Sequence, residues 1–143
     1  MINYTSMGEK AKWEGLYQIR HYVVGSMTLL KLSGKDVKTG RTPIYLEQLN
    51  GEKLRFVSRV LLPKDKEILL GLRFSITENL MEFKAHIVGV ISNEKKKQYT
   101  YLVEFDIDNE EKRVNILSFV NKIQLANKQK KLRNVTQIAI EIE

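Results

Sequence analysis

The feature that most constrains this chain is a series of short runs in which apolar and polar residues alternate, each ended by turn-forming residues. A period of two places every second side chain on one face of a β-strand. Asn50-Gly51 and Glu78-Asn79 are two of the turns, and Asn-Gly suits a tight reversal because both residue types tolerate positive φ. A connector with Pro63 covers residues 60–66. The predicted strands are residues 27–32, 43–49, 54–58, 67–77, 80–92 and 99–107.

The period changes after the last of these strands. Asp108 or Asn109 is a suitable helix cap, and acidic residues follow where they oppose the positive end of a helix dipole. Apolar residues at helical spacing then predict a helix whose stripe packs on the sheet. The stripe consists of Ile116, Phe119, Val120 and Ile123. Beyond Leu132, alternation over residues 135–142 predicts a last strand, at a sheet edge or in a partner.

Consecutive antiparallel strands followed by one helix favour a small closed barrel that the helix plugs or flanks, because closure removes unpaired sheet edges. A chain of 143 residues with 43% apolar side chains suits one compact domain. We predict an N-terminal arm at 1–16 anchored by Trp13, a barrel plus helix at 17–133, and a C-terminal strand or tail at 134–143. The fold class is mainly β.

Composition and the N-terminal sequence restrict the cellular compartment that we expect for this protein. The absence of cysteine excludes disulfides, thiolate metal sites and a cysteine nucleophile, and it suits a reducing compartment. The first residues lack the basic head and apolar run of a secretion signal, and no stretch reaches the ~20 apolar residues of a membrane span. We therefore expect a soluble protein in the cytoplasm.

The net charge of +7 comes from one segment, residues 112–133, which holds basic residues and no acidic ones. A solvated helix face is favoured over a patch that contacts phosphates. Nucleic-acid binding by the barrel is disfavoured because Phe83, Tyr99, Tyr101 and Phe105 alternate as core residues do. The basic residues of the segment are Lys112, Arg113, Lys122, Lys128, Lys130, Lys131 and Arg133.

Signatures of catalysis are missing from the sequence. His21 and His86 stand far apart without metal-ligand spacing, and neither a nucleophile elbow nor a phosphate-binding glycine loop occurs. Asp106 and Asp108 share a strand face but are placed where helix caps occur. We expect a protein that is not an enzyme and has no metal site.

The chain from about Tyr17 to Arg133 resembles a PilZ domain. The resemblance lies in residues 45–58 (YLEQLNGEKLRFVS), 83–89 (FKAHIVG) and 101–105 (YLVEF) and in the terminal helix. It implies a six-stranded antiparallel β-barrel with a C-terminal helix, no cofactor and no catalysis. It also implies a signalling role in which the bacterial second messenger cyclic di-GMP is bound and partner contacts change.

Two motifs carry the ligand in that family, Arg-x-x-x-Arg before the first strand and Asp-x-Ser-x-x-Gly at the junction of the second and third strands. Paired guanidinium groups bind phosphates and guanine edges in a bidentate way. Here Arg20 is followed four residues later by Val24, and the second motif falls on Gln48, Asn50 and Lys53. The ligand-binding residues that this alignment implies are Arg20, His21, Gln48, Asn50, Lys53 and Arg55.

These departures weaken the implied site. A charge-assisted hydrogen bond contributes about 1.5–3 kcal/mol, so losing one arginine contact costs about ten- to a hundredfold in affinity. The expected function is therefore a cyclic di-GMP receptor, or a relative with weakened or lost binding that regulates a partner protein. The alternative is a ligand-independent adaptor that uses the terminal strand or the basic end of the helix, including self-association into a homo-oligomer.

Overall fold

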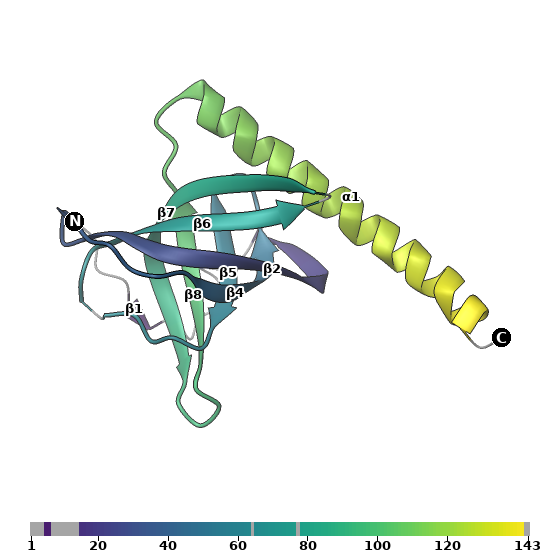
Figure 1. Cartoon of the computed structure of the whole chain (residues 1–143), viewed down its shortest axis with the longest axis horizontal. Coiled ribbons are helices and arrows are strands. Elements are labelled where there is room, and N and C mark those ends of the chain that lie inside the picture. The colour runs from purple at the N-terminus through teal and green to yellow at the C-terminus, as the bar shows by residue number, and fades with distance from the viewer. Residues whose placement is uncertain (1–4, 7–14, 64, 77, 142–143) are drawn as a thin grey trace.

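The structure is a computed structural model that describes residues 5–6, 15–63, 65–76 and 78–141; for residues 5–6, 20–22 and 129–141 it describes the backbone alone. The order of the elements along the chain can be followed by colour in Figure 1. The elements are β1 (Thr5–Ser6), β2 (Tyr17–Leu32), β3 (Lys35–Asp36), β4 (Thr42–Leu49), β5 (Lys53–Ser58), β6 (Ile68–Ile76), β7 (Asn79–Asn93), β8 (Gln98–Phe105) and α1 (Glu110–Glu141).

Six of the strands form a closed antiparallel barrel. Their order is β7, β6, β2, β4, β5, β8, and the circle closes because β8 also pairs with β7. The two short strands lie outside it: β3 pairs with β2, and β1 pairs in parallel with β7. Closure satisfies the backbone groups that an open sheet would leave at its edges. The predicted mainly β class, with a six-stranded barrel and a C-terminal helix, is confirmed.

Two long strands make this closure possible. β2 pairs with β4 through its first part and with β6 through its second part, and the two pairings overlap at residues 25–27. β7 passes from β6 to β8 in the same way. A strand that turns from one neighbour to the next bends the sheet toward a cylinder. The sequence placed the first strand at residue 27, whereas β2 begins at Tyr17.

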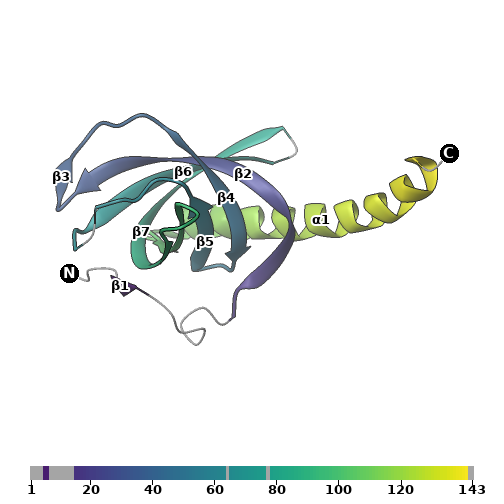
Figure 2. The same cartoon turned by 90° about the horizontal axis from the view of Figure 1, so that it is seen from below.

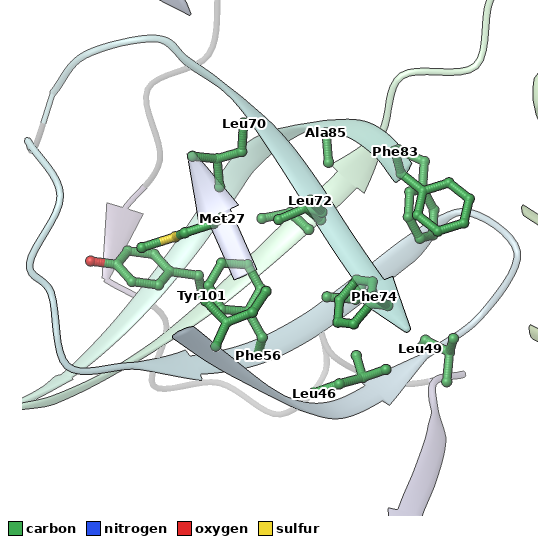
Figure 3. Packing of buried hydrophobic residues seen from close by; sticks show 14 of the residues in the cluster. Met27, Leu46, Leu49, Phe56, Leu70, Leu72, Phe74, Phe83, Ala85 and Tyr101 are labelled. Carbon is green, nitrogen blue, oxygen red and sulfur yellow. The ribbon is translucent and has the colours of Figure 1, made fainter. Parts of the chain in front are cut away.

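The barrel interior holds the apolar side chains of the alternating pattern. Along β6 every second residue is buried, from Ile68 to Ile76, and the residues between them face outward. Figure 3 shows core side chains from several strands, including Met27, Phe74 and Tyr101, meeting inside the barrel. Burying one such side chain contributes about 1.5–3 kcal/mol. The aromatic residues that the sequence predicts in the core, Phe83, Tyr99, Tyr101 and Phe105, are all buried.

The predicted connector between β5 and β6 is tied to the core by one tyrosine. The fully buried Tyr101 accepts a hydrogen bond from the Leu62 backbone N–H at 2.8 Å and donates one to the Val60 carbonyl at 2.9 Å. Because a buried hydroxyl needs partners, these two hydrogen bonds satisfy the hydroxyl group of Tyr101, and they also fix the connector.

The helix α1 begins as the sequence predicts. The Asn109 side chain accepts a hydrogen bond from the Lys112 backbone N–H at 2.8 Å, so Asn109 is the cap, and Glu110 and Glu111 occupy the first turn. The predicted stripe is buried, and the Phe119 ring lies 5.1 Å from Phe74 and 4.8 Å from Phe83, between ring centroids. Figures 1 and 2 show that the first part of α1 lies against the barrel, while the rest extends away from it.

The predicted terminal strand is wrong, because residues 135–141 belong to α1; residue 142 lies outside the described residues. No glycine or proline interrupts the chain after Asn109, and residues 124–133 are mostly good helix formers. The spacing of Val135 and Ile138 also fits a helix, so the alternation there was ambiguous. In the part of the chain that the structure describes, no helix is both long and apolar enough to cross a membrane.

Candidate ligand site at one end of the barrel

The six residues that the family resemblance implies, Arg20, His21, Gln48, Asn50, Lys53 and Arg55, are called the candidate ligand site. They belong to β2, β4, β5 and the β4–β5 turn. Figure 2 shows the start of β2 beside the end of β4 and the start of β5, in agreement with the pairing of Tyr17 with Leu49. The structure therefore brings these backbone segments together at one end of the barrel.

Gln48 lies opposite Gln18 in the pairing of β4 with β2, and its side-chain amide donates a hydrogen bond to the Gln18 side-chain carbonyl. The β4–β5 register shifts between Leu46 and Gln48, so Glu47 and Gln48 are both half-buried while Leu46 and Leu49 are buried. Such a bulge turns two consecutive polar side chains to the outer surface. Sequence reasoning missed Gln18, although it stands two residues before Arg20.

Arg20 and His21 lie within β2, whereas the resemblance placed Arg20 in an arm before the first strand. The register of β2 with β4 shifts between Gln18 and Val23, so both residues fall in an irregular stretch of the strand. Arg20 lies two residues after Gln18, the residue that holds Gln48. Val24, where the family has its second arginine, is 54% exposed. The strand thus presents an apolar side chain at that position.

Asn50 shapes the turn between β4 and β5. Its side-chain oxygen accepts hydrogen bonds from the backbone N–H groups of Glu52 at 2.8 Å and Lys53 at 2.7 Å, and its amide donates to the Gly15 carbonyl at 3.3 Å. Neither Asn50 nor Gly51 has positive φ. The expectation of a positive-φ reversal is therefore wrong, because the asparagine side chain closes the turn instead.

The two cations of β5 have different surroundings. The Arg55 Nε atom lies 2.9 Å from the Glu47 Oε1 atom, and both side chains are 29% exposed. Lys53 faces Glu104 in the register of β5 with β8. Opposite charges across neighbouring strands attract. Arg55 is therefore engaged by a carboxylate of β4, and a ligand anion would have to compete with Glu47 for it.

A shallow cavity of about 290 Å³ adjoins the bulge on the outer face of β4 and β5. It is lined by Tyr45, Glu47, Val57, Arg59 and Gln98. Tyr45 and Val57 are opposite each other in the strand pairing, which places an aromatic ring in this surface. Sequence reasoning did not select these residues, because only the bulge at Glu47 links them to the candidate ligand site.

The remaining polar residues of the sequence analysis have structural settings. Asp108 lies 3.0 Å from the Lys112 Nζ atom across one helical turn, and the Asp106 backbone N–H donates to the Lys84 carbonyl. His86 is a half-buried residue of β7. Within the described residues, no three histidine, aspartate or glutamate side chains gather into a potential metal site.

The fold and the site together define a small closed barrel with an amide-rich surface at one end and a long helix that extends beyond it. No family model matches the sequence, and no curated protein matches it.

Proposed function

We propose that this protein is a PilZ-like cytosolic signalling module that binds cyclic di-GMP weakly at the candidate ligand site and regulates a partner protein. One observation carries the proposal: the register that sets Gln48 opposite Gln18 places the irregular stretch with Arg20 beside the bulge of β4 and the Asn50 turn. Bulges often reorient side chains at functional sites. The closed barrel and terminal helix also support the family resemblance.

Weak binding follows from the contacts that these side chains already make. Gln48 is held by Gln18, the Asn50 oxygen is used by the turn, and Arg55 is paired with Glu47. A ligand must replace these partners, so its net gain is smaller than the full strength of each new hydrogen bond. Val24 offers no charge-assisted bond in place of the second family arginine.

Titration of the full chain with cyclic di-GMP, followed by backbone amide chemical shifts, tests this proposal. We expect saturable shifts confined to residues near Gln18, Gln48 and Lys53. Arg20→Ala should weaken binding about tenfold or more, because it removes a charge-assisted contact. Arg113→Ala on α1 is the matched control and should leave the affinity unchanged. Absent shifts, or equal affinities of the two variants, would reject the proposal.

A gain of affinity provides a second readout at the same site. Val24→Arg combined with Lys53→Gly restores two motif positions, and the exposure of Val24 leaves room for a longer side chain. One added charge-assisted bond of about 1.5–3 kcal/mol should tighten binding about ten- to a hundredfold. Calorimetry measures this directly, and a restored variant that binds no better than the original chain would contradict the assigned site.

A second candidate function is that of a protein-interaction adaptor, and the outer face of α1 favours it. Val114, Leu117 and Leu125 are 55%, 48% and 57% exposed and line one depression on the helix together with Ser118, Asn121 and Lys122. Exposed apolar residues along a helix are typical of helix-in-groove contacts. The occupant that we propose for this face is a second copy of this chain.

A further inference from the structure

A cavity of about 420 Å³ opens between the outward side chains of β2, β6 and β7 and the first turns of α1. None of its lining residues belongs to the candidate ligand site, so the two sites are separate. We call it the basic cavity because four cationic side chains line it: Arg41, Arg73, Lys84 and Lys112. The acidic residues that line it are Glu82 and Asp106.

The floor of the basic cavity is a glycine in the middle of a central strand. Gly71 lies opposite Thr28 on one side and opposite Lys84 on the other. A Cβ atom there would lie 3.3 Å from carbons of the Leu30 and Thr28 side chains. Glycine costs about 0.5–1 kcal/mol in a strand, and such a residue often marks a close approach of another group. The Leu30 and Thr28 side chains therefore approach the backbone closely at Gly71, and Leu30 gives this part of the cavity wall an apolar surface.

Arg41 is held beside Gly71 by neutral groups. Its Nε atom donates to the Ser26 hydroxyl at 2.8 Å, and its Nη2 atom donates to the carbonyls of Ser26 at 3.3 Å and Gly71 at 3.4 Å. These contacts orient the guanidinium group without neutralising its charge.

Among the described residues, two of the four cations have a carboxylate partner and two do not. Arg73 pairs with Glu82 at 2.9 Å, and Lys112 pairs with Asp108 at 3.0 Å. For Arg41 and Lys84, the described residues supply no ion pair. Both unpaired cations flank Gly71, one through its hydrogen bond to the Gly71 carbonyl and the other by strand register. The cavity thus holds two cations without an ion pair among the described residues, next to the apolar Leu30, and the Asp106 carboxylate offsets part of their charge.

The pKa of Arg41 reflects the other charged groups of the basic cavity. Partial burial lowers the pKa of Arg41 most, the neighbouring Arg73 lowers it further, and Glu82 offsets part of the effect. Arginine stays charged at neutral pH despite such shifts. An anion bound beside Arg41 would favour its charged form.

We propose that the basic cavity binds a small organic phosphate monoester, with the phosphate between Arg41 and Lys84 and an apolar body over Gly71 and Leu30. A phosphate monoester carries about −1.5 to −2 charges at neutral pH, and Arg41 and Lys84 supply two positive charges that attract it. The guanidinium fork donates hydrogen bonds to two phosphate oxygens at once. A cavity of about 420 Å³ lies in the size range of small-molecule sites.

The probe for this site is phenyl phosphate, titrated into the full chain and followed by backbone amide shifts. We expect saturable shifts at Leu30, Gly71 and Lys84. Three comparisons define the chemistry: inorganic phosphate lacks the apolar body, benzoate carries one charge, and phenol carries none. Each of these three compounds should bind at least about tenfold more weakly than phenyl phosphate. Phenyl phosphate that binds no tighter than any of these would overturn the proposal.

Variants locate the site. Arg41→Gln and Lys84→Gln should each weaken phenyl phosphate about tenfold, because each removes a charge-assisted contact. The control Lys95→Gln, in the exposed β7–β8 turn, should leave the affinity for phenyl phosphate unchanged. If Arg41→Gln does not fold, Lys84→Gln alone decides. Equal affinity of Lys84→Gln and Lys95→Gln would show non-specific attraction to a basic protein and would overturn the proposal.

Discussion

Gly25 is the residue on which the path of β2 depends most directly. It pairs with Ile44 of β4 and with Phe74 of β6, at the point where β2 passes from one neighbour to the other. A Cβ atom there would lie 2.4 Å and 2.5 Å from carbons of the Phe74 ring and 2.6 Å from the Arg73 carbonyl oxygen. The backbone crossing and the aromatic core therefore both require a residue without a side chain.

Gly25→Ala should lower the free energy of unfolding by about 1–3 kcal/mol, because the methyl group has to displace a core ring or a strand carbonyl. Gly40→Ala is the matched control: no atom lies within 4 Å of its Cβ position, and its φ is not positive. Its effect should stay within about 0.5 kcal/mol. Urea denaturation measures both variants, and equal stability of the two would contradict the crowding at Gly25.

At the same scale, residue patterns located the candidate ligand site only in part. Asn50 was correctly assigned to a turn, because Asn-Gly between two alternating runs indicates one. The predicted positive-φ conformation was wrong, since the Asn50 side chain closes the turn. The engagement of Gln48 by Gln18 depends on a strand pairing thirty residues apart in sequence. Local patterns carry no signal for such a register.

At the scale of elements, alternation predicted the strands from residue 43 onward to within a few residues, since each has one buried face. The first half of β2 was missed because its irregular stretch after Gln18 breaks the alternation. The end of α1 was missed for another reason. Thr, Val and Ile near the C-terminus favour a strand locally, whereas the helix begun at Asn109 meets no residue that ends it.

The start of α1 offers a test at this scale. Asn109→Ala removes the side chain that accepts the Lys112 N–H, so the free energy of unfolding should fall by about 1 kcal/mol. Asn121→Ala replaces an exposed asparagine within the same helix and should leave stability unchanged or slightly higher, because alanine favours helix. Thermal unfolding compares the two. A loss of similar size in both variants would show that the cap contributes nothing specific.

For the whole molecule, the barrel separates three surfaces. The candidate ligand site lies on β2, β4 and β5, and the basic cavity lies on β2, β6 and β7. The exposed apolar residues of α1 lie on the helix face opposite its buried stripe, and one of them, Leu117, lies near Gly51 of the β4–β5 turn. Because α1 extends beyond the barrel, contacts along it reach further from the core than either site does (Figure 1). A long helix with an uncovered apolar face gains stability by pairing.

We expect that pairing to be antiparallel and between two copies of this chain. Val114 and Leu125 are eleven residues apart, so the apolar face spans about 16 Å of helix at about 1.5 Å per residue. The basic residues cluster toward the other end of the segment, from Lys122 to Arg133. An antiparallel arrangement keeps these two like-charged runs apart, whereas a parallel one would bring them together.

Light scattering after size exclusion tests this pairing. The unaltered chain should show a mass above that of one chain, and the mass should rise with salt because screening weakens the remaining repulsion between basic runs. Leu117→Glu with Leu125→Glu should give single chains, since charges then occupy the contact. Lys95→Glu, on the opposite hairpin, should leave the mass unchanged. If the unaltered protein has the mass of one chain at all concentrations, self-association through α1 is ruled out. The barrel would then remain as a ligand-binding module alone.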